Sequence, residues 1–194
     1  MLGQELILTL TTVSKSTTLA VILLLIFSPI ARASEPASTA IVPTRLIIPS
    51  IRLDSPIVPV ELHTFVMNGT TYGKWEVAKN EIGWHNLTAQ LGQPGNTVLA
   101  GHSDINARIF AHLRYVNVGD EIIAFSATHR QAYRYVVTQK ILVQEVGVSL
   151  ETRIQNARWI YPTRDERLTL ITCARPGATH RLIVVAKPVQ AVSD

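Results

Sequence analysis

The sequence contains a single cysteine among its 194 residues, and this scarcity excludes two kinds of protein. One thiol cannot form an intrachain disulfide, and it cannot build a metal site made of several thiolates. Runs of like charge are also missing, because 18 basic and 14 acidic residues leave a formal net charge of only +4. Without a basic patch or stripe, the sequence gives no sign of a nucleic-acid partner.

Long apolar runs are missing too, except near the N-terminus. Residues 18–30 form an apolar stretch that is shorter than the roughly 20 residues of a membrane-spanning helix. Lys15 precedes this stretch and Ala31-Arg32-Ala33 follows it, which is the layout of a signal peptide with its cleavage site. Residues 1–33 are therefore either a signal peptide or an N-terminal membrane anchor. Both interpretations predict an exported protein, either at the extracytoplasmic face of the cell membrane or secreted to the cell surface.

The remainder of the chain divides into a linker and one domain. Residues 34–43 are small, polar and proline-bearing, which is typical of an extended linker. Residues 44–190 alternate between short apolar runs and turn residues, which is typical of an all-β barrel or sandwich. Eight strands are predicted, at residues 45–48, 57–62, 97–100, 121–125, 133–138, 141–146, 168–172 and 182–186.

Two short helices are expected within this all-β domain. Ile105, Ile109, Phe110 and Leu113 would share one face of a helix over residues 103–113, with Ser103 or Asp104 as its cap. This helix would begin immediately after a histidine. A second helical turn is expected over residues 150–156.

Cys173 is the most informative single residue, because it follows the predicted strand 168–172 rather than lying within it. A lone cysteine is most often a small buried hydrophobic residue. Here, however, Arg175 and Arg181 lie nearby in the sequence, and cations beside a thiol stabilise the thiolate. A thiol retained in an exported protein also favours a chemical role, so Cys173 is a candidate nucleophile.

A cysteine nucleophile needs an acid–base partner and a group that stabilises the oxyanion. Among the six histidines, His102 follows Ala100-Gly101 at the end of a predicted strand, and His180 directly precedes Arg181. Spacing alone does not choose between these two histidines. A zinc site is not expected, because one cysteine and no closely spaced histidine pair are too few ligands. No other metal site and no cofactor is predicted.

Three segments together resemble the motifs of the sortase family. Residues 168–173, Leu-Thr-Leu-Ile-Thr-Cys, resemble the Thr-Leu-x-Thr-Cys motif, and Ala100-Gly-His102 resembles the histidine motif. Arg181, eight residues after the cysteine, begins a segment that resembles the strand carrying the family's arginine. The resemblance extends over roughly residues 44–187.

This resemblance implies both a fold and a set of roles. The fold would be a closed eight-stranded sortase-type β-barrel with one or two short helices. Cys173 would be the nucleophile, His102 the general acid and base, and Arg181 the group that stabilises the oxyanion. Thr172 would line the oxyanion and substrate site.

The implied activity is that of a cysteine transpeptidase. It would cleave a C-terminal Leu-Pro-x-Thr-Gly-like sorting signal of another exported protein through a thioester. It would then transfer that protein to an amine of the cell wall or of a pilus subunit. The compact chain resembles the small class D, E and F enzymes more than the pilus-building ones. The alternative is a non-catalytic exported β-barrel that binds wall glycan or protein, with Cys173 inert.

Overall fold

The computed structural model describes residues 41–126, 132–174 and 178–189. The predicted signal peptide or anchor, residues 1–33, and most of the predicted linker lie outside these ranges. Within the described ranges, no helix has the length and apolar character needed to cross a membrane.

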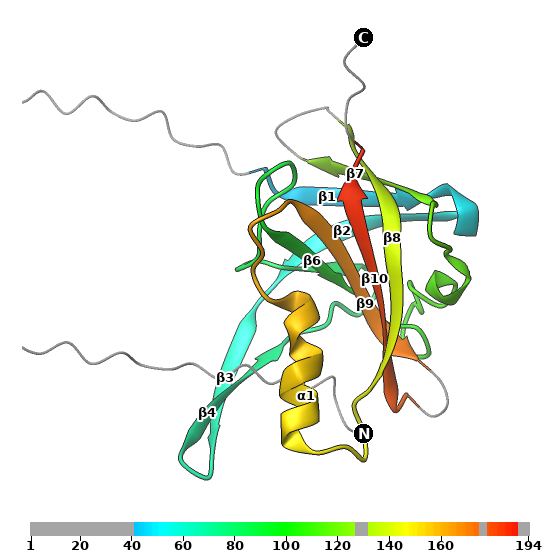
Figure 1. The fold of residues 1–194 in the computed structure, drawn as a ribbon. Coiled ribbons are helices and arrows are strands. Elements are labelled where there is room, and N and C mark those ends of the chain that lie inside the picture. The colour runs from blue at the N-terminus through cyan, green and yellow to red at the C-terminus, as the bar shows by residue number, and fades with distance from the viewer. Residues whose placement is uncertain (1–40, 127–131, 175–177, 190–194) are drawn as a thin grey trace, which may run out of the picture.

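Eight strands form a closed barrel in the order β1-β2-β5-β6-β9-β10-β8-β7, and β3 and β4 form a separate hairpin that projects from it (Figure 1). Most neighbours are antiparallel, but β2 pairs with β5, and β6 with β9, in parallel. The predicted closed eight-stranded barrel is therefore confirmed. The strands are β1 Pro43–Ile48, β2 Leu53–Val60, β3 Leu62–Met67, β4 Thr70–Trp75, β5 Ile82–His85, β6 Asn96–Ala100, β7 Glu121–Ser126, β8 Ala132–Gln144, β9 Arg167–Ala174 and β10 His180–Pro188.

The set of barrel strands differs from the predicted set in three places. The segments 133–138 and 141–146 are one strand, β8, because no turn residue separates them. β2 begins at Leu53 rather than at residue 57 and ends at Val60. The barrel's remaining strand, β5, is only four residues long and was not predicted.

The hairpin of β3 and β4 was also not predicted, although its turn carries a strong local signal. Asn68 and Gly69 both have positive φ, at 51° and 75°. This is the conformation that an Asn-Gly dipeptide adopts in a two-residue hairpin turn.

The predicted helix over residues 103–113 is wrong. Asn106 and Arg108 have φ values of 55° and 51°, and a right-handed helix cannot pass through left-handed residues. The segment is instead an irregular loop that ends in the 3-10 helix η2, Leu113–Tyr115. Its apolar residues therefore do not share one buried face: Phe110 and Leu113 are buried, whereas Ile105 is exposed.

The other predicted helix is confirmed as α1, Leu150–Ala157, which continues into the 3-10 helix η3, Arg158–Ile160. Its N-cap residue, Ser149, accepts a hydrogen bond from the Thr152 backbone N–H through its side chain. Such a cap satisfies one of the free N–H groups of the first turn. The third 3-10 helix, η1, spans Pro49–Ile51 and joins β1 to β2.

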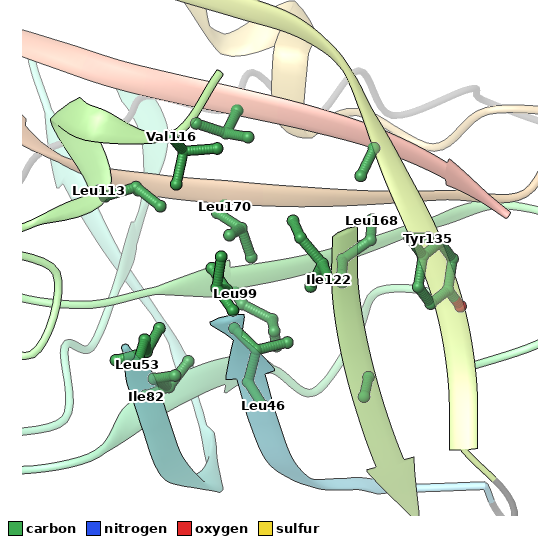
Figure 2. Close-up of a cluster of buried hydrophobic side chains, with 14 of the residues drawn as sticks. Leu46, Leu53, Ile82, Leu99, Leu113, Val116, Ile122, Tyr135, Leu168 and Leu170 are labelled. Carbon is green, nitrogen blue, oxygen red and sulfur yellow. The ribbon is translucent and has the colours of Figure 1, made fainter. Parts of the chain in front are cut away.

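Two apolar clusters occupy opposite faces of the sheet formed by β9 and β10. Leu168, Leu170, Leu182 and Val184 belong to the inner cluster, which fills the barrel; Figure 2 shows several of its side chains. The residues between them face outward, because successive strand side chains alternate between faces. The outer cluster contains Val60, Trp75, Val98, Ala100, Ile160, Ile171, Ile183 and Val185.

Stability should depend strongly on the inner cluster. Leu170 is fully buried and lies in register between Leu99 of β6 and Val184 of β10. Replacing Leu170 with alanine should lower the free energy of unfolding by about 2–5 kcal/mol through lost burial and a residual cavity. The matched control is Leu87→Ala, which removes an exposed leucine and should change it by less than about 0.5 kcal/mol. Denaturant titration measures both, and equal effects would contradict the assignment of the core.

Candidate active site

Strands β9 and β10 place Cys173 and Arg181 directly opposite each other. The two residues are partners in the antiparallel register, and opposed side chains of such a pair lie on the same face with Cβ atoms about 4.5–5.5 Å apart. That face is the outer one, because Ile171 and Ile183 precede and follow them on it. The strand pairing therefore brings a thiol and a guanidinium together.

Arg181 is held in place by its surroundings. It is 7% exposed, and its Nη1 donates hydrogen bonds to the carbonyl oxygens of Ala178 at 3.2 Å and His180 at 3.1 Å. A buried charge needs such partners to offset its lost hydration. The competing cation, Arg175, lies outside the described residues.

His102 reaches this site through the parallel pairing of β6 with β9. The register ends at Ala100 opposite Ile171. The backbone contact extends one residue further, because the Gly101 N–H donates to the Ile171 carbonyl at 3.2 Å. The chain after Gly101 therefore runs beside the chain after Ile171, and this brings His102 toward Cys173.

Two side-chain hydrogen bonds fix the chain on both sides of His102. The Thr172 hydroxyl donates to the carbonyl of Gly101 at 2.6 Å. The Ser103 hydroxyl donates to the carbonyl of Cys173 at 2.7 Å. The histidine is thus bracketed by contacts to Thr172 and Cys173, so its backbone lies at the end of the cysteine strand.

The hydrogen bond to the Gly101 carbonyl also fixes the side chain of Thr172. Its side chain is 1% exposed and belongs to the inner face, opposite to that of Cys173, because neighbouring strand residues alternate. Its hydroxyl binds a backbone carbonyl. Thr172 therefore holds the histidine loop against β9, and it also lines the pocket described below.

The environment of His102 favours its neutral form. Partial burial lowers the pKa of His102, and the negative charge of Asp104 opposes this effect. Desolvation penalises the charged imidazolium, so a smaller fraction of this histidine is protonated near neutral pH.

Two other histidines, His85 and His180, have structural surroundings. His85 is buried and stacks on Trp75 with ring centroids 4.1 Å apart, and burial lowers the pKa of His85 to about 3. His180 interacts through Nδ1 with the hydroxyl of Thr179 at 2.8 Å. His180 also faces away from Arg181, its neighbour in β10.

Sequence reasoning missed Glu145, a buried residue that connects three elements through its backbone and its carboxylate. The backbone N–H groups of Glu145 and Val146 both donate to the carbonyl of Thr179, at 2.8 and 3.1 Å. The carboxylate accepts a hydrogen bond from Asn156 at 3.0 Å and forms an ion pair with Arg153 of α1 at 3.5 Å. The end of β8, the start of β10 and the helix are thereby joined. No local pattern marks this role, since a Glu before a turn is usually solvated.

A pocket of about 430 Å³ opens beside Cys173. Its wall includes Cys173, Thr172 and Leu182 from the strands, and Ser103 and Phe110 from the loop after His102. In the part of the chain that the structure describes, no group of three or more His, Cys, Asp or Glu residues is placed to hold a metal ion.

Comparisons with known proteins identify the family and the fold. A family model described as Sortase domain matches residues 46–189. A comparison with curated protein sequences gives no match.

Solved structures of three sortases share the fold. A sortase D5 transpeptidase from Clostridium perfringens is 23% identical with a TM-score of 0.56, over 76% of this chain and 79% of that one. Sortase C-1 from Actinomyces oris is 24% identical with a TM-score of 0.56, over 76% of this chain and 73% of that one. A lid mutant of sortase A from Corynebacterium diphtheriae is 22% identical with a TM-score of 0.56, over 80% of this chain and 74% of that one.

The three structures carry different class letters, so they do not choose among sortase classes. The expectation of a small class D, E or F enzyme stays a prediction. The family itself is settled by the match over most of the chain: this protein belongs to the sortase family, whose members are cysteine transpeptidases.

Proposed function

We propose that this sortase cleaves a C-terminal Leu-Pro-x-Thr-Gly-like sorting signal and joins the released protein to an amine of the cell wall or of another surface protein. The observation that carries the proposal is the register of β9 and β10, which sets Cys173 opposite Arg181. The bracketing of His102 beside the same strand end adds the acid–base group.

In the first half of the reaction, the Cys173 thiolate attacks the scissile carbonyl and forms a carbon–sulfur bond. Arg181 stabilises the oxyanion, and its hydrogen bonds to two carbonyls hold the guanidinium ready for this role. His102, as the imidazolium, protonates the leaving amine, and the carbon–nitrogen bond breaks. The product is a thioester on Cys173.

In the second half of the reaction, an amine rather than water attacks the thioester. Neutral His102 takes the proton from the attacking amine, and the new carbon–nitrogen bond forms as the Cys173 thiolate leaves. The lowered pKa of His102 favours the neutral form that this half requires.

The outer apolar cluster packs β9 and β10 beneath the site. Ile171 and Ile183 lie on the same face of the sheet as Cys173 and Arg181, but they are only 6% and 1% exposed. The Leu-Pro part of the proposed sorting signal therefore rests on the family and not on contacts to this cluster. Thr172 contributes indirectly, because its hydroxyl holds the loop that carries His102.

The proposed setting follows from the family and from the N-terminal sequence. Sortases typically act outside the cytoplasm while anchored to the membrane. Residues 1–33, as an uncleaved anchor, would hold the domain there, and its partners are exported proteins with sorting signals. The non-catalytic alternative requires an inert thiol, whereas Cys173 is half-buried at the edge of a pocket rather than sealed in the core.

The first test is a library of fluorogenic pentapeptides, incubated with the purified domain with and without an added amine. We expect cleavage of Leu-Pro-x-Thr-Gly-like members and ligation to the amine. Cys173→Ala should abolish both while leaving the circular dichroism spectrum unchanged, since no thioester can form without the thiol. Turnover by Cys173→Ala on a cognate peptide would refute the proposal.

A second test separates the histidines. His102→Ala should lower kcat/KM by about 10²–10⁴, the usual contribution of a general acid–base group. The matched control is His180→Ala, which removes the histidine that faces away from Arg181 and should have a much smaller effect. Steady-state kinetics on one peptide measures both variants. A larger loss at His180 would move the acid–base role to that residue.

A third test concerns the oxyanion. Arg181→Ala should lower kcat/KM by about 10²–10³, the usual cost of losing one oxyanion donor. Arg181→Lys should restore only part of the rate, because an ammonium keeps the charge but lacks the planar pair of donors. Arg175→Ala serves as the control cation, and a loss there that exceeds the loss at Arg181 would contradict the assignment.

A further inference from the structure

The guanidinium of Arg181 is held by the backbone that immediately precedes it. Its Nη1 donates to the carbonyls of Ala178 and His180, at 3.2 and 3.1 Å. The carbonyl between these two, that of Thr179, accepts two backbone N–H groups from the chain at the end of β8, at 2.8 and 3.1 Å. Three successive carbonyls are therefore fixed, two by the guanidinium and one by β8. The position of Arg181 thus depends on a segment that β8 holds in place.

The same segment contains strained backbone. Ala178 has a φ of 59°, which lies in the left-handed region that residues with a Cβ atom rarely adopt. Such a conformation persists only where the surrounding contacts determine it. The contact of Thr179 with the end of β8 is one of these contacts. If that contact is loosened, we expect the segment to relax and to carry the two carbonyls away from the Arg181 guanidinium.

The end of β8 is itself held by α1, which follows it in the chain (Figure 1). The donors to the Thr179 carbonyl are Glu145 and the residue after it, just beyond the last residue of the strand. The Asn156 side chain donates through Nδ2 to the Gln144 carbonyl at 2.7 Å and to Glu145 Oε1 at 3.0 Å. The same carboxylate forms an ion pair with Arg153 at 3.5 Å. Two helix residues therefore fix the part of the chain that holds Thr179.

The burial of the Glu145 carboxylate is a second, independent observation. Its side chain is only 2% exposed, and burying a charge is costly even when the charge is paired. A buried ion pair usually adds little net stability, and its best-attested use is to select one arrangement of the chain. Strand alternation places Glu145 on the same face as Val143, the register partner of Arg181. The arrangement that the ion pair selects therefore includes the surroundings of Arg181.

We propose that Glu145 is a positioning residue for Arg181. Its carboxylate fixes the end of β8 against Asn156 and Arg153 of α1. The fixed end of β8 holds the Thr179 carbonyl, and the two neighbouring carbonyls hold the guanidinium. This inference rests on the proposed function, in which Arg181 stabilises the oxyanion. Such a donor is effective only if it already points to the place where the negative charge develops, and α1 supplies that constraint from outside the barrel.

The first measurement needs no substrate. In proton–nitrogen NMR spectra of the purified protein, rotation about the Cζ–Nη bonds broadens the Nη–H signals of a mobile arginine, and hydrogen bonds to fixed carbonyls slow that rotation. The Arg181 signals are identified by their loss in Arg181→Lys. We expect Glu145→Ala and Asn156→Ala to abolish the sharp signals, because both remove contacts that fix the end of β8. The matched control is Glu121→Ala, which removes another strand glutamate that pairs with an arginine, Arg134, and should leave the signals sharp.

Kinetics on one donor peptide then tests whether the effect passes through the oxyanion donor. Glu145→Ala should lower kcat by about 10- to 100-fold and leave KM within about twofold, because it displaces a contact made in the transition state. Glu145→Gln should lower kcat by a smaller factor, because the amide keeps the hydrogen bond from Asn156 and loses only the ion pair. In the Arg181→Ala background, Glu145→Ala should lower kcat/KM further by less than about twofold, whereas independent losses would multiply. Glu121→Ala should behave like the wild type.

Thermal unfolding checks that each variant is folded, and Glu145→Gln with Asn156→Ala replaces Glu145→Ala if the latter is not. Sharp Arg181 signals in the Glu145 and Asn156 variants would overturn the positioning role alone. A Glu145 loss that persists in full without Arg181, or a change confined to KM, would do the same, the latter assigning α1 to donor binding. Absence of donor cleavage by the wild type, or cleavage that survives Cys173→Ala, would overturn the proposed function on which the inference rests.

Discussion

The parallel pairing of β6 with β9 is the interaction on which the arrangement of the site depends. It places the residue after Ala100 next to the residue after Ile171, and the hydrogen bond from Thr172 to Gly101 extends this contact by one step. Without that register, His102 would follow a strand end with no relation to the cysteine. The pairing of β9 with β10 then adds Arg181. Three chain segments therefore meet through backbone hydrogen bonds, which hold position better than flexible loops do.

Strand β9 also separates two environments, because its side chains alternate. The outer face combines Cys173 with Arg181 and continues into an apolar cluster. The inner face, at the mouth of the barrel, carries Thr172 and opens into a pocket with several cations. Cys173 thus lies at the strand end where the two faces meet, beside Arg181 on one face and at the edge of the pocket on the other.

Much of this arrangement could be predicted from the sequence, and the exceptions have physical causes. Apolar runs ended by turn residues located most strands, and the motifs around Cys173, His102 and Arg181 identified the family. The apolar spacing from Ile105 to Leu113 fits a helix, yet left-handed backbone at Asn106 and Arg108 prevents one. The role of Glu145 arises from contacts to α1 and to the start of β10. Such contacts have no signature in a single sequence, because only the fold brings their partners together.

The site joins parts of the chain that are distant in sequence, since Gly101 and Thr172, which share a hydrogen bond, are 71 residues apart. Contacts of such long range form late in folding, because the intervening loop must first lose conformational entropy. The chain is synthesised from its N-terminus, so the histidine is made well before the cysteine and the arginine strand. A nascent or unfolded chain consequently carries Cys173 without a neighbouring imidazole or a fixed guanidinium. In the proposed mechanism, the thiol therefore gains its acid–base partner and its oxyanion-stabilising group only when the barrel has closed.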